Sequence, residues 1–142
     1  MQAPHPPLRE YYTQEAERRG WVRQIFDRTA GDYDRIERVM ALGSGSWYRR
    51  SALHRAGLRP GMQVLDIGAG TGLTAKQAAF LVGISGQVTG IDPCPGMIRR
   101  AKVPAAVQLL IGSAEAIPAS AETADFLCMG YALRHIADFS AA

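Results

Sequence analysis

One short segment, an apolar run that leads directly into three alternating glycines, constrains the fold of this chain more than any other feature. Residues 65–74 read LDIGAGTGLT, so Gly68, Gly70 and Gly72 follow a strand pattern and precede a helical one. Glycines at such spacing let another molecule approach the main chain, and Thr71 between them is placed for the same contact. A strand, glycine turn and helix in this order predict a nucleotide-cofactor turn in a doubly wound α/β fold.

The second half of the chain repeats the alternation of strand and helix. The predicted strands are QVLDIG, GQVTGID, AVQLLIG and ADFLCMGYAL, and the predicted crossover helices are TAKQAAFLVG and PGMIRRAK. Strands that are apolar on both faces indicate a parallel sheet covered by helices. We therefore predict a Rossmann-like fold, with residues 59–142 as its cofactor-binding half.

The first 58 residues have a different pattern. Residues 1–12 are rich in proline and predict a flexible arm, and residues 13–58 predict a helical cap. We expect one helix from about Thr13 to Asp27, an interruption at Gly31, and a second helical stretch, YDRIERVMAL, that stops at the GSGS turn. A third helix, WYRRSALHRAG, should end with Gly57 as its C-terminal cap.

Two acidic residues at the ends of the first two strands indicate the ligand. Asp66 stands two residues before the first glycine, where a carboxylate repels a pyrophosphate but attracts a cation. The GxGxG spacing of the glycines also differs from the GxGxxG fingerprint of dinucleotide-binding proteins. Asp92 follows the VTGI strand and could accept hydrogen bonds from ribose hydroxyls. The two acids predict a nucleoside joined to an amino acid, namely S-adenosylmethionine. The alternatives are a turn-capping acid at Asp66 and a helix N-cap at Asp92 before Pro93.

Two further segments could contact the adenine ring. Ser113 and Ala114 follow the third strand at the carboxyl edge of the sheet, although an ordinary strand-to-loop exit is an equal alternative. Met97 could lie along the adenine face, or it could simply be a core residue.

The composition of the chain indicates its domain number, its possible partners and its compartment. With 142 residues, 47% hydrophobic and 20% charged, the chain suits one globular domain, and no apolar run is long enough to cross a bilayer. The net charge of +3 comes from arginines in the first 60 residues. The favoured interpretation of these arginines is a solvated helical face, and the second is contact with an anionic membrane. We expect no nucleic-acid partner. Cys94 and Cys128 lack the spacing of a metal site or a disulfide, so we expect no metal and a cytoplasmic protein.

These segments resemble class I S-adenosylmethionine-dependent methyltransferases, and more narrowly the ubiquinone and menaquinone C-methyltransferase family. VLDIGAGTGLTAK resembles its cofactor loop, VTGIDPCPGMIRRAK its ribose-binding segment, and GSAEAIPASAETADF its adenine loop. FDRTAGDYDRIERVMALGSGSWYRRSAL and YALRHIAD are similar to the two stretches that are specific to the quinone family. Ser113 stands where this family usually has Asn or Asp, and Gly130 where it often has Ser.

The resemblance implies roles for residues on the acceptor side. Gly130 would contact the cofactor, while His135 would act as a base and Arg134 would stabilise a phenolate. Tyr33 would close over the cofactor. Each has a plain alternative: His135 as a helix-start or surface histidine, Arg134 as a salt-bridged surface residue, and Tyr33 as a core aromatic of the cap.

The sequence given stops after the fourth predicted strand, where the family continues with further strands. We therefore expect a fragment, or a chain whose fourth strand is covered by a homo-oligomer contact or another partner. The leading hypothesis is a C-methyltransferase for a prenylated quinol, in the cytoplasm and peripheral to the inner membrane. The alternatives are a methyltransferase for another small molecule, a non-catalytic cofactor-binding module and, last, a nicotinamide oxidoreductase.

Overall fold

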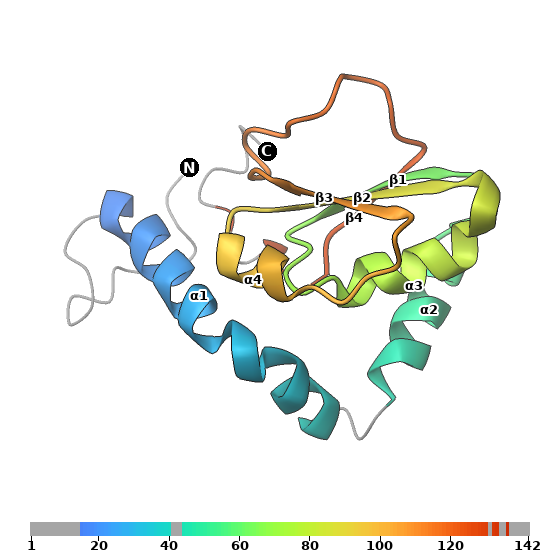
Figure 1. Cartoon of the computed structure of the whole chain (residues 1–142). Helices are drawn as coiled ribbons and strands as arrows, with labels where there is room; N and C mark the ends of the chain where they lie inside the picture. The colour runs from blue at the N-terminus through green and yellow to red at the C-terminus, as the bar shows by residue number, and fades with distance from the viewer. Residues whose placement is uncertain (1–14, 41–43, 131, 134–135, 137–142) are drawn as a thin grey trace.

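The computed structural model describes residues 15–40, 44–130, 132–133 and 136 (Figure 1). The predicted arm of residues 1–12 lies outside this part of the chain. Along the chain, the helices and strands are α1 (Glu15–Met40), α2 (Gly45–Arg55), β1 (Gln63–Ile67), α3 (Leu73–Val82), the 3-10 turn Gly83–Ser85, β2 (Gln87–Asp92), α4 (Pro95–Arg100), β3 (Val107–Ile111) and β4 (Phe126–Cys128).

The four strands form one parallel sheet in the order β3-β2-β1-β4. The register places Val64 of β1 beside Val88 of β2 and Phe126 of β4, and Val88 beside Val107 of β3. This arrangement confirms the predicted Rossmann-like α/β fold. β4 is shorter than the predicted run ADFLCMGYAL, because only three of those residues pair with β1.

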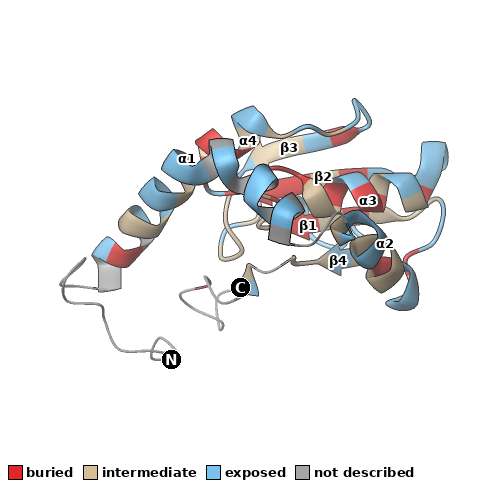
Figure 2. Ribbon diagram, turned by 90° about the horizontal axis from the view of Figure 1, so that it is seen from below, coloured by how far each residue is buried: buried red, intermediate tan, exposed pale blue. Residues whose placement is uncertain are grey.

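All four α-helices lie on the same side of the sheet, and the loop between β3 and β4 runs over the other side (Figure 1). The core lies on the helical side, where valines from three strands pack against Ala75, Ala78 and Val82 of α3. Buried residues accordingly concentrate along the central strands and on the face of α3 that meets them (Figure 2).

The predicted interruption at Gly31 is wrong, because α1 runs without a break from Glu15 to Met40. A glycine inside a helix costs about 1 kcal/mol relative to alanine but keeps its hydrogen bond, so it does not end a helix as proline does. Ile36, in the second half of α1, is 53% exposed. The second half of α1 therefore does not pack on the sheet through that residue.

The end of α2 confirms the predicted cap at Gly57. The N–H of Gly57 donates to the carbonyl of His54 at 3.1 Å, and the N–H of Leu58 donates to that of Leu53 at 3.1 Å. Gly57 has a φ of 104°. This is a Schellman motif, and its apolar contact is supplied by Leu53 and Leu58, which are both buried in the core.

Candidate cofactor site

A cavity of about 390 Å³ opens at the carboxyl ends of the strands, between α1 and the glycine loop. This edge is where ligands bind in open α/β sheets. Seven of the residues predicted for cofactor binding line the cavity: Gly68, Gly70, Thr71, Asp92, Met97, Ser113 and Gly130. The structure thus brings together residues from four separate segments of the sequence.

The three glycines of the loop all have left-handed backbone conformations, with φ of 71° at Gly68, 57° at Gly70 and 83° at Gly72. A Cβ on Gly68 would lie 2.3 Å from that of Ala132, and a Cβ on Gly72 would lie 2.3 Å from Val103 Cγ1. A Cβ on Gly70 would meet no atom within 4 Å. Gly68 and Gly72 are therefore needed for packing within the chain, whereas Gly70 leaves open space at the cavity.

Asp92 holds the loop against the end of β2. Its Oδ2 accepts a hydrogen bond from Gly70 N–H at 2.8 Å, and its Oδ1 accepts one from Cys94 N–H at 2.8 Å. Burial raises the pKa of Asp92 above its ordinary value, while these two main-chain donors act in the opposite direction. The carboxylate faces the cavity. It therefore fixes the loop and also keeps acceptor capacity for a ribose hydroxyl.

Asp66 takes a different position. It is 0% exposed and is not among the residues that line the cavity. Its Oδ1 lies 3.5 Å from Cys128 Sγ, and its Oδ2 has no hydrogen-bond partner in the described structure. Burial raises the pKa of this carboxyl to about 7. An orphaned buried oxygen next to the loop fits a cationic ligand group, but direct contact between Asp66 and the cofactor stays a prediction.

Two other predicted cofactor residues do not line the cavity. Gly72 is buried behind the loop against Val103, and Ala114 is half-buried beyond Ser113. Ser113 bridges to Ala116, whose N–H donates to the Ser113 carbonyl at 3.1 Å. This tight turn follows Ser113 directly, and Glu115 within it lines the cavity whereas Ala114 does not. Contacts from Gly72 and Ala114 to a bound cofactor therefore remain predictions.

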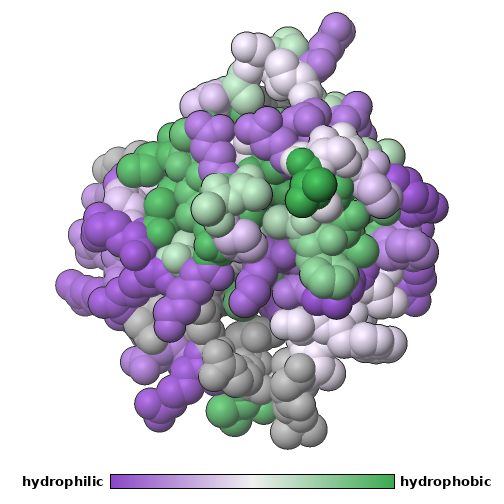
Figure 3. All heavy atoms as spheres, turned by 45° about the vertical axis from the view of Figure 1, so that its right-hand side comes forward, coloured by the Kyte–Doolittle hydropathy of each residue, from purple (hydrophilic) through white to green (hydrophobic). Residues whose placement is uncertain are grey.

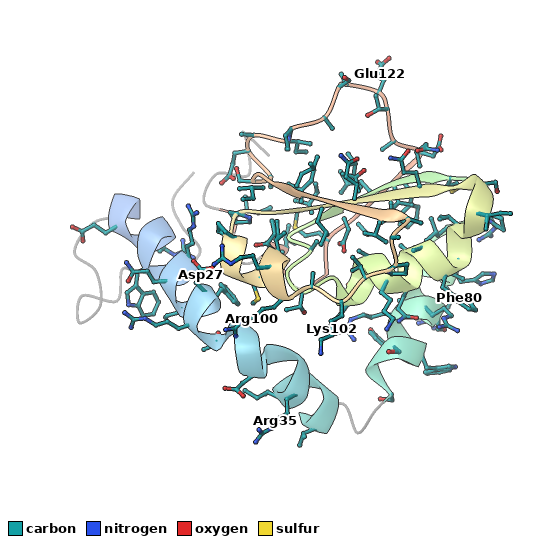
Figure 4. All side chains as sticks on the ribbon, in the orientation of Figure 1. Asp27, Arg35, Phe80, Arg100, Lys102 and Glu122 are labelled. Carbon is teal, nitrogen blue, oxygen red and sulfur yellow. The ribbon has the colours of Figure 1, made fainter. Side chains whose placement is uncertain are left out.

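Helix α1 forms the opposite wall of the cavity, which the sequence patterns did not predict. Phe26 packs against Met97 and Cys94, and Asp27 reaches from α1 toward α4, where its Oδ1 accepts a hydrogen bond from Gly96 N–H at 2.8 Å (Figure 4). A Cβ on Gly96 would lie 2.4 Å from that oxygen, so the glycine permits this cap. The cap ties α1 to the predicted ribose-binding segment.

Three arginines lie at the cavity, which the favoured interpretation of the arginines as a solvated helical face does not account for. Arg18, from α1, lines the cavity and is only 6% exposed, and Arg23 and Arg49 also line it. Glu115 adds an acidic side chain on the β3 side. The available signal was the spacing of Arg18, Val22 and Phe26, which repeats every four residues and places all three on one face of α1.

Three residues are predicted to act on the methyl acceptor, namely Tyr33, Arg134 and His135. Arg134 and His135 lie outside the described residues. The backbone of Tyr33 belongs to α1, and nothing further is described of it. The roles of all three stay predictions. Among the described residues, no group of three or more His, Cys, Asp and Glu side chains could hold a metal ion.

The model of the ubiE/COQ5 methyltransferase family matches residues 12–142. The chain belongs to this family. The match includes α1, the glycine loop and the end of β2, so it covers both walls of the cavity. It confirms the resemblance to the ubiquinone and menaquinone methyltransferases and identifies the predicted cofactor, S-adenosylmethionine, as that of the family.

Curated relatives carry names from quinone biosynthesis. The chain is 33% identical to a demethylmenaquinone methyltransferase of Symbiobacterium thermophilum over 96% of its own length and 53% of that protein. It is 31% identical to a ubiquinone/menaquinone biosynthesis C-methyltransferase of Shewanella piezotolerans, over 93% of its length and 56% of that protein. A 2-phytyl-1,4-naphtoquinone methyltransferase of Synechocystis is 33% identical, over 85% of this chain and 54% of that protein. The chain thus spans about half the length of these relatives.

Solved structures agree on the fold. A SAM-dependent methyltransferase from Aquifex aeolicus superposes with a TM-score of 0.57 at 27% identity, over 63% of this chain and 51% of that one. A methyltransferase structure from Methanococcus maripaludis gives a TM-score of 0.69 over 81% of this chain and 54% of that one. Its identity is 18%, so it supports the fold alone. The architecture is that of an S-adenosylmethionine-dependent methyltransferase.

Proposed function

We propose that this chain acts in the transfer of a methyl group from S-adenosylmethionine to a ring carbon of a quinol, as in ubiquinone and menaquinone biosynthesis. The observation that carries this proposal is the family match over residues 12–142, which includes the helix that closes the cavity. Its named relatives methylate demethylmenaquinone or a phytylated naphthoquinone, or take part in ubiquinone and menaquinone biosynthesis. The second candidate, after the quinol, is another small acceptor such as a phenol, an amine or a secondary metabolite.

Methyl transfer requires the protein mainly to align the acceptor carbon with the methyl group of the cofactor. The bound cofactor supplies an activated methyl group, so the chain needs no nucleophile of its own. Asp92 and the glycine loop would hold the nucleoside, and α1 would exclude water from the cavity. A ring carbon becomes a good nucleophile once a neighbouring phenol loses its proton. Arg134, His135 and Tyr33 are our candidates for removing that proton or stabilising the phenolate.

The test is methyl transfer by the chain itself. The chain is incubated with S-adenosylmethionine labelled in its methyl group and with the reduced form of a short-chain 2-prenyl-1,4-naphthoquinone, and the extracted lipid is counted. Label in the quinol, and none in a naphthalene that lacks both hydroxyls, is the expected result. Cofactor binding without any transfer would instead support a non-catalytic binding module, and transfer to simple phenols alone would support the alternative acceptor.

We also propose that the α1–α2 end of the molecule contacts the membrane in which such quinols dissolve, which would place a cytoplasmic chain at the inner membrane. The support is a group of exposed apolar and aromatic side chains: Ile36 (53% exposed), Val39 (67%), Trp47 (72%) and Tyr48 (52%). Trp and Tyr favour the interface of a bilayer. Figure 3 presents one face of the molecule, on which hydrophobic and strongly hydrophilic residues are mixed. Among the described residues, no helix combines the length and apolarity needed to span a bilayer.

Sedimentation with vesicles tests this contact. The wild-type chain should sediment with vesicles that contain phosphatidylglycerol, and Trp47→Ser should sediment less. Equal sedimentation of the two chains would contradict the placement of the contact at α2.

A partner that covers the outer edge of β4 is a further part of the proposal. In the described sheet β4 pairs only with β1, and Leu127 at its centre is 56% exposed. An open apolar edge favours pairing with another segment, either in a homo-oligomer or with a different chain. Light scattering across a range of concentrations tests the homo-oligomer, which Leu127→Lys should dissociate.

A further inference from the structure

One group of the cofactor has no assigned partner among the side chains of the proposed site. The inference that follows rests on the proposed function, and specifically on S-adenosylmethionine as the ligand. Its amino-acid moiety carries an ammonium and a carboxylate. Asp66 suits the ammonium and Asp92 suits the ribose, but both are acids, so neither can bind the carboxylate.

Three arginines line the cavity, and they come from two different walls. Arg18 and Arg23 belong to α1, which is fixed to the ribose end of the site by the hydrogen bond from Gly96 N–H to Asp27. Arg49 belongs to α2, which packs against α3, the helix that the glycine loop enters. Arg49 is therefore the arginine on the side of the cavity where the amino-acid moiety would lie.

The charge of Arg49 acts on Asp66. Burial is the main influence on the pKa of the Asp66 carboxyl and raises it, whereas the cation of Arg49 is one of the groups that lower it. Arg49 at the cavity and the buried acid Asp66 beneath its glycine loop form a complementary pair for a zwitterion, because each carries the charge opposite to one group of the ligand.

The residue next to Arg49 shows how its position is fixed. Arg50 donates from Nε and Nη2 to Gln77 Oε1 at 3.1 and 2.9 Å, and its guanidinium lies 3.7 Å from the centroid of the Phe80 ring. Both partners belong to α3 (Figure 4). Leu53, one turn further along α2, is buried in the core. These contacts lock α2 onto α3, so the guanidinium of Arg49 is presented to the cavity by a rigid element.

We propose that Arg49 binds the carboxylate of the cofactor's amino-acid moiety, and that Arg50 is the positioning residue that fixes α2 for this contact. A guanidinium can hold a carboxylate with two parallel hydrogen bonds, which also orients the ligand. The sulfonium methyl would thereby be held in a fixed direction.

The competing partner for the carboxylate is the main chain at the start of α3. That helix has Gly72 as its N-cap, no side-chain capping hydrogen bond and no acidic residue in its first turn. Free N–H groups at a helix N-terminus attract anions. The two possibilities differ in one measurable respect, because only the first makes the discrimination for a carboxylate depend on the side chain of Arg49.

The test compares two cofactor analogues by calorimetric titration. S-adenosylmethionine carries the carboxylate, and decarboxylated S-adenosylmethionine lacks only that group while keeping the sulfonium and the ammonium. The wild-type chain should bind the first more tightly, roughly tenfold to a hundredfold, which is the range expected for a hydrogen bond between charged groups. Arg49→Gln should abolish this preference by weakening only the first ligand, and Arg49→Lys should restore part of it.

Arg55→Gln is the matched control, since it removes an exposed arginine of the same helix that does not line the cavity. It should weaken both ligands by a similar factor, or neither, and keep the preference. The ratio of the two affinities is unaffected by a partly unfolded fraction, because that fraction binds neither ligand. An Arg49→Gln chain that keeps the wild-type preference would overturn the assignment in favour of the helix start. A wild-type chain that binds neither ligand would overturn the proposed function, and this inference with it.

Discussion

The buried carboxyl of Asp66 gives the sharpest energetic prediction. Its side chain is 0% exposed, and its Oδ2 has no hydrogen-bond partner in the described structure. Burial raises its pKa from 3.8 to about 7, although the Cys128 thiol, the main chain at Ala75 and the cation of Arg49 oppose that change. The folded chain therefore keeps a proton on Asp66 across a range of pH in which the unfolded chain has released it.

The sign of the resulting pH dependence follows from this difference. Because the folded pKa is the higher one, protonation stabilises the folded state, and that stabilisation is lost as the pH rises through about 7. A difference of one in pKa corresponds to about 1.4 kcal/mol, so the loss between strongly acidic and alkaline pH is about 4 kcal/mol. The part that falls between pH 5 and pH 8 is about 3 kcal/mol.

Asp66→Asn removes this titration, because asparagine is neutral at every pH. We expect the unfolding free energy of the variant, relative to wild type, to rise by about 3 kcal/mol from pH 5 to pH 8. Urea unfolding at intervals of half a pH unit measures it, without any ligand. Asp32→Asn is the matched control, since Asp32 is an exposed carboxylate of α1. Parallel pH profiles for wild type and Asp66→Asn would refute the argument.

The same carboxyl links cofactor binding to protons. If the ligand ammonium lies at Oδ2, binding favours the ionised acid, and the chain should release close to one proton at pH 6 when it binds S-adenosylhomocysteine. Titrations in two buffers of different protonation enthalpy count that proton. Asp66→Asn should remove the release. An unchanged release in the variant would place the ammonium elsewhere and would leave Asp66 as a purely structural acid.

Three other changes follow from the geometry of the site. Gly68→Ala should destabilise the chain by about 2 to 4 kcal/mol in urea unfolding, because its φ of 71° and a Cβ only 2.3 Å from Ala132 both oppose a side chain. Gly70→Ala should cost only about 1 to 2 kcal/mol of stability, through backbone strain. It should weaken S-adenosylhomocysteine binding in calorimetry, because its Cβ enters open space at the cavity. A loss of stability equal to that of Gly68→Ala would contradict this distinction. Asp27→Ala should lower the unfolding free energy by about 1 kcal/mol through loss of the cap on Gly96 N–H, and an unchanged thermal midpoint would show that the cap contributes nothing.

Local patterns predicted the cofactor half of this fold well. The strand–glycine–helix order of residues 63–82 and the acid at the end of β2 depend on backbone conformation and on residue type, which the sequence displays directly. Gly57 was recognisable as a helix cap for the same reason, since a positive φ favours glycine. Gly31 shows the limit of such signals, because a glycine without a tertiary reason to turn remains inside its helix.

The wall formed by α1 could not be predicted in the same way. Helical spacing places Arg18, Val22 and Phe26 on one face, but it does not say which surface that face meets. The answer depends on Asp27 and Gly96, which are 69 residues apart and meet only in the folded chain. A buried arginine at this wall therefore looked, in the sequence, like the exposed arginines around it.

Asp66 shows that a sequence pattern can select a residue without giving the direction of its side chain. Side chains alternate along a strand, so Asp66 must point to the same side of β1 as Val64, and Val64 packs in the core beneath α3. The register then sets Asp66 beside Cys128 of β4, which explains their contact. Asp92 is the last residue of β2, so the alternation of side chains along the strand does not bury it in the same way. The chain turns immediately after it, and its carboxylate contacts Gly70 and Cys94 and faces the cavity. Of the two acids, Asp92 therefore lines the cavity, whereas Asp66 lies beneath the loop, and its contact with the ligand ammonium stays a prediction.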